Sequence, residues 1–476
     1  MILSYEYQEK YGNSYILKNC KIYDDKVDKF FIKDIEIIEG KISKIEDSNI
    51  ANNKDNTNNK DNTNNNININ TNTNTNTNKN NLPLIDLNEK LVIGGVIDAH
   101  VHFRHGNEEK ETFKTGCEAG LNGGVCFAID MPNSNPPTIT KQLFDEKVQK
   151  AKGDNCAINL YFAYGITENN YMDIVDDAKF YKIFMVKSVG ELFINDYYKL
   201  KEILMQNKLF AIHAEHKNFI EEFCDKNNKT DEDGKFKFIT HCRMRDRYSE
   251  INAIDEVLKV LYEIDNEKCV INKEITPKVH FCHVSTKEAL LLIKKAKETL
   301  KNVVITCEVS PHHLILNEEM AEDLKGMGKF NPPLRTKMDN LALINGINDK
   351  TVDIIATDHA PHTYEQKMKD NIMECPSGIG GIETLVPIVF DLAKEKKIKL
   401  EDAIKMVSVN PSKIFSINNS LNVSNMANIT VIDLYDNTIV NASEFKSKAK
   451  FSPYDNMIFK CKIYSTIING KYYKNY

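Results

Sequence analysis

Apolar, strand-like runs recur along the middle of the chain, and segments with apolar residues at helical spacing separate most of them. The runs cover residues 91–99, 125–131, 157–165, 181–186, 209–215, 278–284, 303–309 and 352–358. No Gly-x-Gly-x-x-Gly follows the first run, which disfavours a dinucleotide-binding fold. Eight strands alternating with helices predict an α/β fold of the (β/α)8 TIM barrel type rather than an open doubly wound sheet.

The clearest helical pattern covers residues 286–300. Ser285 and Glu288 stand three positions apart at its start, and this spacing predicts a capping box in which the two side chains satisfy free backbone N–H groups. A second helix is expected over residues 249–264, where apolar side chains again recur at helical spacing.

Both ends of the chain carry short alternating patterns outside the barrel region. Residues 34–45 contain two such runs about a Glu-Gly pair, which predicts a β-hairpin, and the C-terminal region adds further strand-like runs. We therefore expect a small composite β domain formed by residues 1–90 and 425–476, beside a barrel formed by residues 91–424. Two unrelated β extensions are the alternative interpretation.

One segment does not fit either domain. In residues 51–81 (the Asn-rich insert), 17 of 31 residues are asparagine, and the segment ends in an Asn-Thr repeat. Such a polar segment has no apolar periodicity and cannot offset the entropy lost on ordering. We predict a disordered loop inserted into the N-terminal part of the β domain.

The composition of the chain limits the kinds of partner and the cellular environment that we expect. The net charge of −6 gives no reason to expect nucleic acid, and no apolar stretch is long enough to span a bilayer. The N-terminal residues lack the pattern of a signal peptide. Eleven cysteines occur without a Cys-x-x-Cys pair, and several lie inside apolar runs. Buried thiols in a reducing, cytoplasmic environment are therefore expected rather than disulfides.

Candidate chemistry begins with His100 and His102, which end the first apolar run. Alternate residues of a strand point to the same face, so both imidazoles can bind one metal ion. Alone, this pair is weak evidence, and two packed or solvated histidines are the favoured interpretation. However, all twelve histidines lie between His100 and His362. Several fall at strand ends, where barrel enzymes carry their chemistry.

Titratable residues mark the ends or beginnings of four further apolar runs: Lys182, His213, His283 and Asp358. That recurrence is difficult to explain by core packing alone. For Lys182 the residues by themselves favour a lysine whose ammonium reaches the surface along its apolar stem. The thiols of Cys282 and Cys307 stand near these positions, and packed thiols are their favoured interpretation.

Seven motifs in order resemble dihydroorotases, which belong to the amidohydrolase superfamily. They are Asp98-Ala-His-Val-His-Phe-Arg, Met131-Pro-Asn, His213-Ala-Glu, Cys282-His-Val, Cys307-Glu-Val-Ser-Pro-His-His, Asn331-Pro-Pro-Leu-Arg and Asp358-His-Ala-Pro-His. The similarity runs from about residue 91 to Phe415, and the terminal strands match the small β domain of that family. Most of the chain outside the Asn-rich insert is covered.

The resemblance implies reversible cyclisation of N-carbamoyl-L-aspartate to L-dihydroorotate, a step of pyrimidine biosynthesis, with two Zn²⁺ per subunit. By similarity His100, His102 and Asp358 hold one ion, and His213 and His283 hold the other. Lys182, carbamylated to a carboxylate-like group, bridges the two. Two metal ions stabilise the oxyanion of a tetrahedral intermediate and activate water near neutral pH.

The resemblance also assigns the remaining roles. Asp358 is the general acid and base as well as a metal ligand. Four residues contact the substrate: Arg104, Asn133, Asn331 and His362. Arg104 is expected to bind the substrate carboxylate with its two-pronged guanidinium group. Glu308 and His313 are expected beside the metal ligands. Ser188 stands in a loop position where relatives with the lysine bridge often have a Thr-Phe pair, and the aromatic residue is absent here.

Other functions remain open at this point. A dihydropyrimidinase or hydantoinase shares the histidines but lacks Arg104 and Asn133, and an allantoinase fails the same test. An inactive relative that serves as a scaffold would have lost metal ligands, whereas every ligand position here is filled. The resemblance further suggests a homodimer, association with aspartate transcarbamoylase, and no nucleic-acid or membrane partner.

Overall fold

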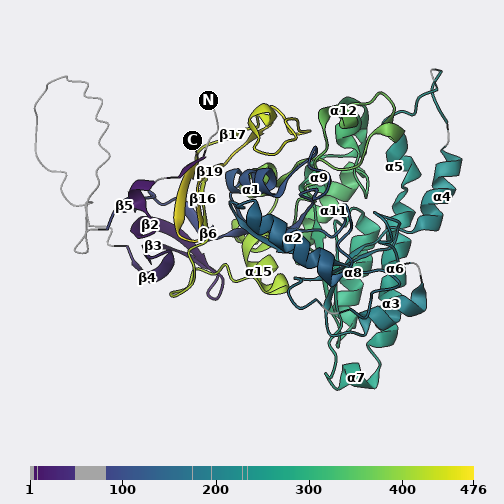
Figure 1. Ribbon diagram of the computed structural model, residues 1–476, viewed down its shortest axis with the longest axis horizontal. Coiled ribbons are helices and arrows are strands. Elements are labelled where there is room, and N and C mark those ends of the chain that lie inside the picture. The colour runs from purple at the N-terminus through teal and green to yellow at the C-terminus, as the bar shows by residue number, and fades with distance from the viewer. Residues whose placement is uncertain are drawn as a thin grey trace, which may run out of the picture.

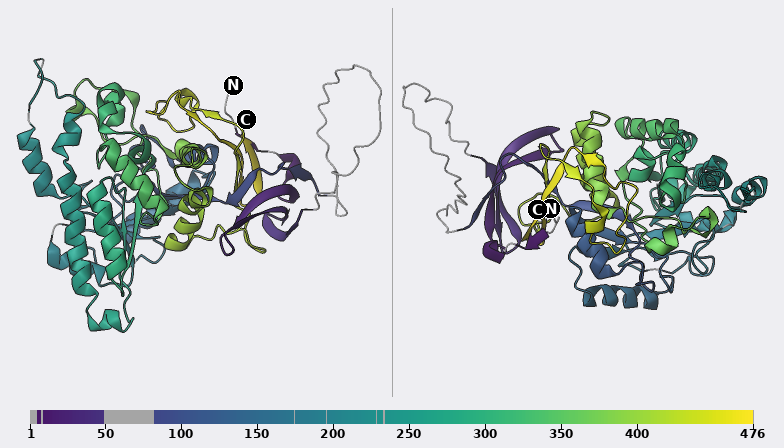
Figure 2. Two further views of the ribbon diagram at one scale, coloured as in Figure 1. Left: turned by 180° about the vertical axis from the view of Figure 1, so that it is seen from behind. Right: turned by 90° about the horizontal axis from the view of Figure 1, so that it is seen from above.

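The structure is a computed structural model that describes residues 5–7, 9–48, 82–173, 175–194, 196–227, 229–232 and 234–475. The Asn-rich insert, for which we predict disorder, lies outside the described residues. Figures 1 and 2 show a β-sheet at one end of the molecule and a larger body of strands and helices beside it. None of the helices in the described ranges has the length and apolar character needed to cross a membrane.

The larger body is a parallel barrel. Its strands are β7 Val96–Val101, β8 Val125–Asp130, β9 Asn159–Phe162, β10 Tyr164–Gly165, β11 Tyr181–Phe184, β12 Leu209–His213, β13 Lys278–Phe281, β14 Val304–Val309 and β15 Ile354–Ile355. Neighbouring strands pair in parallel from β7 to β9 and from β10 to β15. Only Ala163 separates β9 from β10, so these two fill one strand position. A parallel bridge between Val101 and His359 closes the ring, and the predicted (β/α)8 barrel is confirmed.

Helices surround the barrel (Figure 1). They are α1 Phe113–Asn122, α2 Lys141–Gly153, α3 Tyr197–Leu204, α4 Lys217–Lys226, α5 Thr240–Met244, α6 Arg247–Ile264, α7 Lys268–Ile271, α8 Lys287–Thr299, α9 Pro311–Ile315, α10 Ala321–Leu324, α11 Lys337–Asn348, α12 Tyr364–Lys367, α13 Leu385–Lys394, α14 Leu400–Ile404 and α15 Asn410–Phe415. The helices expected over residues 249–264 and 286–300 correspond to α6 and α8.

The predicted cap of α8 is wrong by one residue. The hydroxyl group of Thr286, not that of Ser285, accepts a hydrogen bond from the backbone N–H of Ala289, at 3.3 Å. Ser285 instead donates its hydroxyl to Glu250 of α6, at 2.8 Å. Ser285 therefore bonds a residue distant in the sequence, Glu250, instead of capping α8 as the local pattern predicts.

The sheet at the end of the molecule combines strands from both ends of the chain, which confirms the composite β domain. Its order is β1 Tyr5–Tyr7, β20 Lys471–Asn475, β19 Lys462–Ile468, β16 Ile429–Asp433, β6 Leu91–Gly94, β2 Tyr15–Asp24, β3 Lys29–Ile38 and β4 Lys41–Asp47, with β5 Leu84–Asp86 paired to β2. The β3–β4 hairpin turns at Gly40, whose positive φ of 80° suits glycine. The limits proposed for the two domains stay a prediction.

The expected single strand over residues 91–99 is two strands. β6 pairs with β2 and β16 in the terminal sheet, whereas β7 opens the barrel. They meet at Gly95, where a Cβ atom would lie 2.6 Å from the Cβ of Cys126. The glycine therefore lets the chain pass close to β8 as it leaves one sheet for the other.

Candidate metal centre and active site

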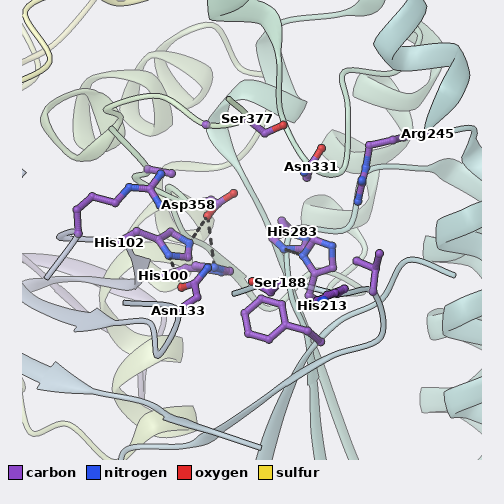
Figure 3. Close-up of a pocket in the computed structure, with 16 residues that line it drawn as sticks. His100, His102, Asn133, Ser188, His213, Arg245, His283, Asn331, Asp358 and Ser377 are labelled. Carbon is purple, nitrogen blue, oxygen red and sulfur yellow. Dashed lines mark hydrogen bonds and ion pairs between the residues drawn. The ribbon is translucent and has the colours of Figure 1, made fainter. Parts of the chain in front are cut away.

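A pocket of about 180 Å³ opens at the carboxyl ends of the barrel strands. It is lined by His100, His102, Arg104, Asn133, Phe184, Val186, Lys187, Ser188, His213, Arg245, His283, Asn331, Asp358, Ala360, Ser377 and Gly378. Figure 3 shows His100, His102 and Asp358 grouped on one side of it and His213 with His283 on the other. The barrel thus brings together side chains that are more than 250 positions apart in the sequence.

The first group has the geometry of a metal site. The Nε2 atom of His102 lies 2.9 Å from Oδ1 of Asp358, and Nε2 of His100 lies 3.4 Å from the same oxygen. Ligand-type atoms of all three residues fall within 4.8 Å of one another. These three donors, two imidazoles and a carboxylate, are a set that zinc and similar ions accept.

The second group consists of His213 at the end of β12 and His283 after β13. Nδ1 of His213 lies 2.9 Å from Nε2 of His283, so both ring nitrogens face one point. The rings of His283 and His100 are 5.3 Å apart between centroids, which places the two groups side by side. His283 has a positive φ of 35°, a backbone conformation that non-glycine residues rarely adopt and that is frequent at functional sites.

Two buried carboxylates, Glu308 and Glu215, and the half-buried amide of Asn133 orient these imidazoles. Glu308 of β14 lies 2.5 Å from Nδ1 of His100 and also contacts His280 at 3.1 Å. Asn133 accepts from Nδ1 of His102 at 2.7 Å, and Glu215 lies 2.8 Å from Nε2 of His213. Because each acceptor binds the N–H proton of one ring nitrogen, the other nitrogen is the one that can bind a metal ion once it carries no proton of its own.

The electrostatics suit a cation at the first group. Burial lowers the pKa of His102 to about 4, so this imidazole is neutral at pH 7. Burial also lowers the pKa of His100, but Glu308 and Asp358 outweigh it and raise that pKa to about 10. A positive charge between the Glu308 and Asp358 carboxylates is therefore stabilised, and a proton or a metal ion can supply it.

Lys182 on β11 points into the barrel and is fully buried. Its Nζ atom lies 2.7 Å from Sγ of Cys282 and 5.3 Å from the centroid of the Phe184 ring. No carboxylate of the described residues lies within 4.0 Å of this nitrogen. A buried ammonium group without an acidic partner is costly, and the alternative of a lysine that reaches the surface is wrong.

Arg104 and Asn331 line the same pocket, whereas His362 and His313 do not. Arg104 is partly buried and donates from Nε to the carbonyl of Pro361, at 3.1 Å. His362 stands behind it, 3.0 Å from an Nη atom, and also lies 2.9 Å from the carbonyl of Ser377. His313 bonds the carbonyl of Pro332 at 3.0 Å instead of facing the pocket.

Sequence reasoning missed Arg245, Glu215 and the Ser377–Gly378 part of the wall. Arg245 follows α5 and pairs with Glu215 through two nitrogens, one of them at 3.1 Å. Glu215 stands in the His-Ala-Glu motif, two residues after His213, and that spacing was an available signal. Arg245 and Ser377 come from loops, and no local pattern marks them.

Comparison with known proteins defines the class. A model of the amidohydrolase family matches residues 91–472, and the chain belongs to this metal-dependent family. Solved structures of an L-hydantoinase from Arthrobacter aurescens (24% identical) and a dihydropyrimidinase from Brevibacillus agri (18% identical) superpose with TM-scores of 0.80 and 0.78. They cover 96% of this chain, and 95% and 94% of their own chains. At these identities the likeness shows the fold alone.

Sequence relatives narrow the class further. A dihydroorotase from Methanosarcina acetivorans is 33% identical over 393 residues, which are 79% of this chain and 80% of the relative. A dihydroorotase from Methanosphaera stadtmanae is 31% identical over 468 residues, or 96% and 95% of the two chains. The chain is therefore a hydrolase acting on cyclic amides, of the dihydroorotase type.

Proposed function

We propose that this enzyme interconverts N-carbamoyl-L-aspartate and L-dihydroorotate. The observation that carries the proposal is Arg104, whose guanidinium group lies in the pocket wall beside the first metal group. Within the described part of the chain, no carboxylate stands within 4.0 Å of it. Dihydroorotate carries a carboxylate that can supply the missing partner, whereas hydantoin and dihydrouracil do not.

Two Zn²⁺ ions fit the donors present. His100, His102 and Asp358 would hold one, and His213 with His283 the other. Lys182 would bridge them after carbamylation, because that modification replaces a buried ammonium group, which has no carboxylate within 4.0 Å among the described residues, with an anion. When bound, the ions would supply Lewis acidity at the amide carbonyl and lower the pKa of water.

Asp358 and Asn331 would then have separate roles toward the substrate. Asp358 would take the proton of the attacking water and return it to the ring nitrogen that leaves, and the reverse in cyclisation. The His100 and His102 imidazoles hold the pKa of Asp358 well below its usual range although burial raises it, so the carboxylate starts ionised. Asn331 has a buried Oδ1 atom without a hydrogen-bond partner among the described residues. It would accept a ring N–H of the substrate.

We also propose a cytoplasmic homodimer, with association to aspartate transcarbamoylase as a further property. Neither rests on a contact within this chain. Role assignments for Glu308 and His313 follow the geometry: Glu308 would orient His100, whereas His313 would support the loop that carries Asn331 through its bond to Pro332.

The test is a comparison of cyclic amides by the loss of their ultraviolet absorbance on ring opening. Zinc-loaded, bicarbonate-treated protein is given L-dihydroorotate, dihydrouracil or hydantoin, with and without a chelator. We expect turnover of dihydroorotate that the chelator abolishes. Faster turnover of the uncharged amides would identify a hydantoinase-type enzyme instead. No turnover of any of them would favour the inactive scaffold.

A further inference from the structure

A buried polar network joins the C-terminal part of the chain to the active site. Between β16 and β19 the chain leaves the terminal sheet as residues 434–461 (the C-terminal excursion), which include the short strands β17 Thr438–Ile439 and β18 Ile458–Phe459. Figure 1 shows this yellow segment extending beside the barrel. Residues 446–448 of the excursion contact two buried carboxylates of the barrel, Glu111 and Glu383.

Glu111 precedes α1 and is fully buried. It accepts hydrogen bonds from the hydroxyl groups of Ser447, at 2.5 Å, and Thr115. The backbone N–H of Lys448 also points at it, at 3.3 Å and 3.4 Å from its two oxygens. Burial alone raises the pKa of Glu111, but His359, Ser447 and Thr115 together hold it below its usual value. The C-terminal excursion thus keeps an anion in place inside the barrel.

That anion faces His359, the residue after Asp358. The Nδ1 atom of His359 accepts from the backbone N–H groups of Gly381 and Ile382, at 3.0 Å and 3.3 Å. Since Nδ1 is an acceptor, the ring proton is on Nε2, which lies 3.6 Å from a carboxylate oxygen of Glu111. The distance is too long for a hydrogen bond, and the attraction is between the N–H dipole and the buried charge.

His359 in turn fixes the backbone on which Asp358 is mounted. Its carbonyl accepts from the N–H of His102 at 2.7 Å, and its own N–H donates to Thr357 at 2.9 Å. Asp358 has a positive φ of 51°, which a non-glycine residue keeps only where its surroundings hold it. The hydrogen bonds on both sides of Asp358, together with the His359 ring, supply those surroundings.

We propose that Glu111 and His359 are positioning residues that hold the Asp358 carboxylate toward the metal groups, and that Ser447 of the C-terminal excursion locks Glu111 in place. None of the three lines the pocket, so they act through Asp358 and not on the substrate. The proposal rests on the proposed function of Asp358.

The experiment compares Ser447→Ala and Glu111→Gln with Ser443→Ala in the full-length protein. Ser443 is the matched control, because its exposed hydroxyl group lies in the same excursion and, among the described residues, bonds only Asn441, at 2.7 Å. For each variant we would measure the rate at which a chelator removes zinc, kcat and KM for dihydroorotate, and the Tm. Two variants of His359 are added. In His359→Gln the side-chain amide N–H can take the position of the His359 Nε2–H, whereas His359→Ala has no donor there.

We expect Ser447→Ala and Glu111→Gln to lose zinc faster and to show roughly tenfold lower kcat with little change in KM. Ser443→Ala should match the wild type, and His359→Gln should keep more activity and zinc than His359→Ala. Ser447→Ala and Glu111→Gln variants that keep wild-type zinc retention and kcat would overturn the proposal, as would a rise in KM that accounts for the whole loss.

A lowered Tm in Glu111→Gln would not confuse the result, because Ser447→Ala removes a single hydroxyl group and tests the same contact. If the wild type bound zinc but turned over no dihydroorotate, the proposed function would fail while zinc retention still ranked the variants. Equal zinc retention in all of them would then overturn the positioning role as well.

Discussion

Replacement of Arg104 by methionine should change the choice of substrate more than the chemistry itself. The methionine keeps much of the apolar stem but removes the only charge that we assign to the substrate carboxylate. Burial lowers the pKa of Arg104 to about 10, so the guanidinium group is still charged at neutral pH. Among the described residues its side chain bonds the carbonyl of Pro361 at 3.1 Å and lies 3.0 Å from Nε2 of His362, which leaves further N–H donors for a ligand.

The size of the effect follows from the bonds that are lost. A hydrogen bond to a charged group contributes about 1.5–3 kcal/mol, and a guanidinium group can make two to one carboxylate. Because Arg104 is only partly buried, we take about 3 kcal/mol for the pair, at the low end. That corresponds to a loss of roughly 100-fold in kcat/KM for dihydroorotate.

The assay measures kcat/KM for dihydroorotate and for dihydrouracil, the same ring without the carboxylate, in wild type, Arg104→Met and Arg104→Lys. Dihydrouracil should be affected by no more than a few-fold, and the lysine variant should recover part of the loss because it keeps the charge. Equal losses for both substrates in Arg104→Met, at unchanged zinc content and Tm, would refute the role of Arg104 in carboxylate binding.

Three further changes test two parts of the site and one buried carboxylate outside it. His100→Ala should abolish turnover and reduce bound zinc, measured by metal analysis; unchanged values would remove His100 from the metal site. Glu215→Gln removes the carboxylate that contacts Nε2 of His213, and it should weaken zinc binding by about 10–100-fold in a chelator titration. Wild-type zinc affinity in this variant would show that His213 binds the metal without a neighbouring anion. Burial raises the pKa of Glu383 from 4.5 to about 7, so folding stability should fall as pH rises between these values, because the folded state binds more protons there. Urea unfolding at several pH values should show this loss, at most about 3 kcal/mol, in the wild type and not in Glu383→Gln; parallel curves would exclude Glu383 as its source.

The barrel was predictable because its strands are buried on both faces and therefore appear as continuous apolar runs. Because burial continues through both segments, the sequence pattern did not show the boundary between β6 and β7. Leu91–Gly94 and Val96–Val101 are both almost wholly buried, and only their pairing partners show that they belong to different sheets. A local pattern reports that a segment is buried, but it does not report against which strand.

Apart from Lys182, which lies near the start of β11, the residues proposed as metal ligands were predictable for a geometric reason. In a parallel barrel the carboxyl ends of all strands meet at one rim, so a titratable residue at a strand end is placed there whatever the loops do. His213 and Asp358 follow this rule. Arg245 and Ser377 reach the same pocket from loops, whose path depends on packing that no short pattern encodes.

The partners of buried polar groups are the least predictable part of the site. Burial of a carboxylate requires hydrogen bonds, so a sequence that places Glu111 in the barrel implies that donors exist. It does not say that one of them is Ser447, 336 positions later, or that the other side of the carboxylate faces His359. Such contacts are formed only when the C-terminal excursion packs on the barrel. The environment of Asp358 is therefore a property of the whole chain, although the position of Asp358 is a property of one strand end.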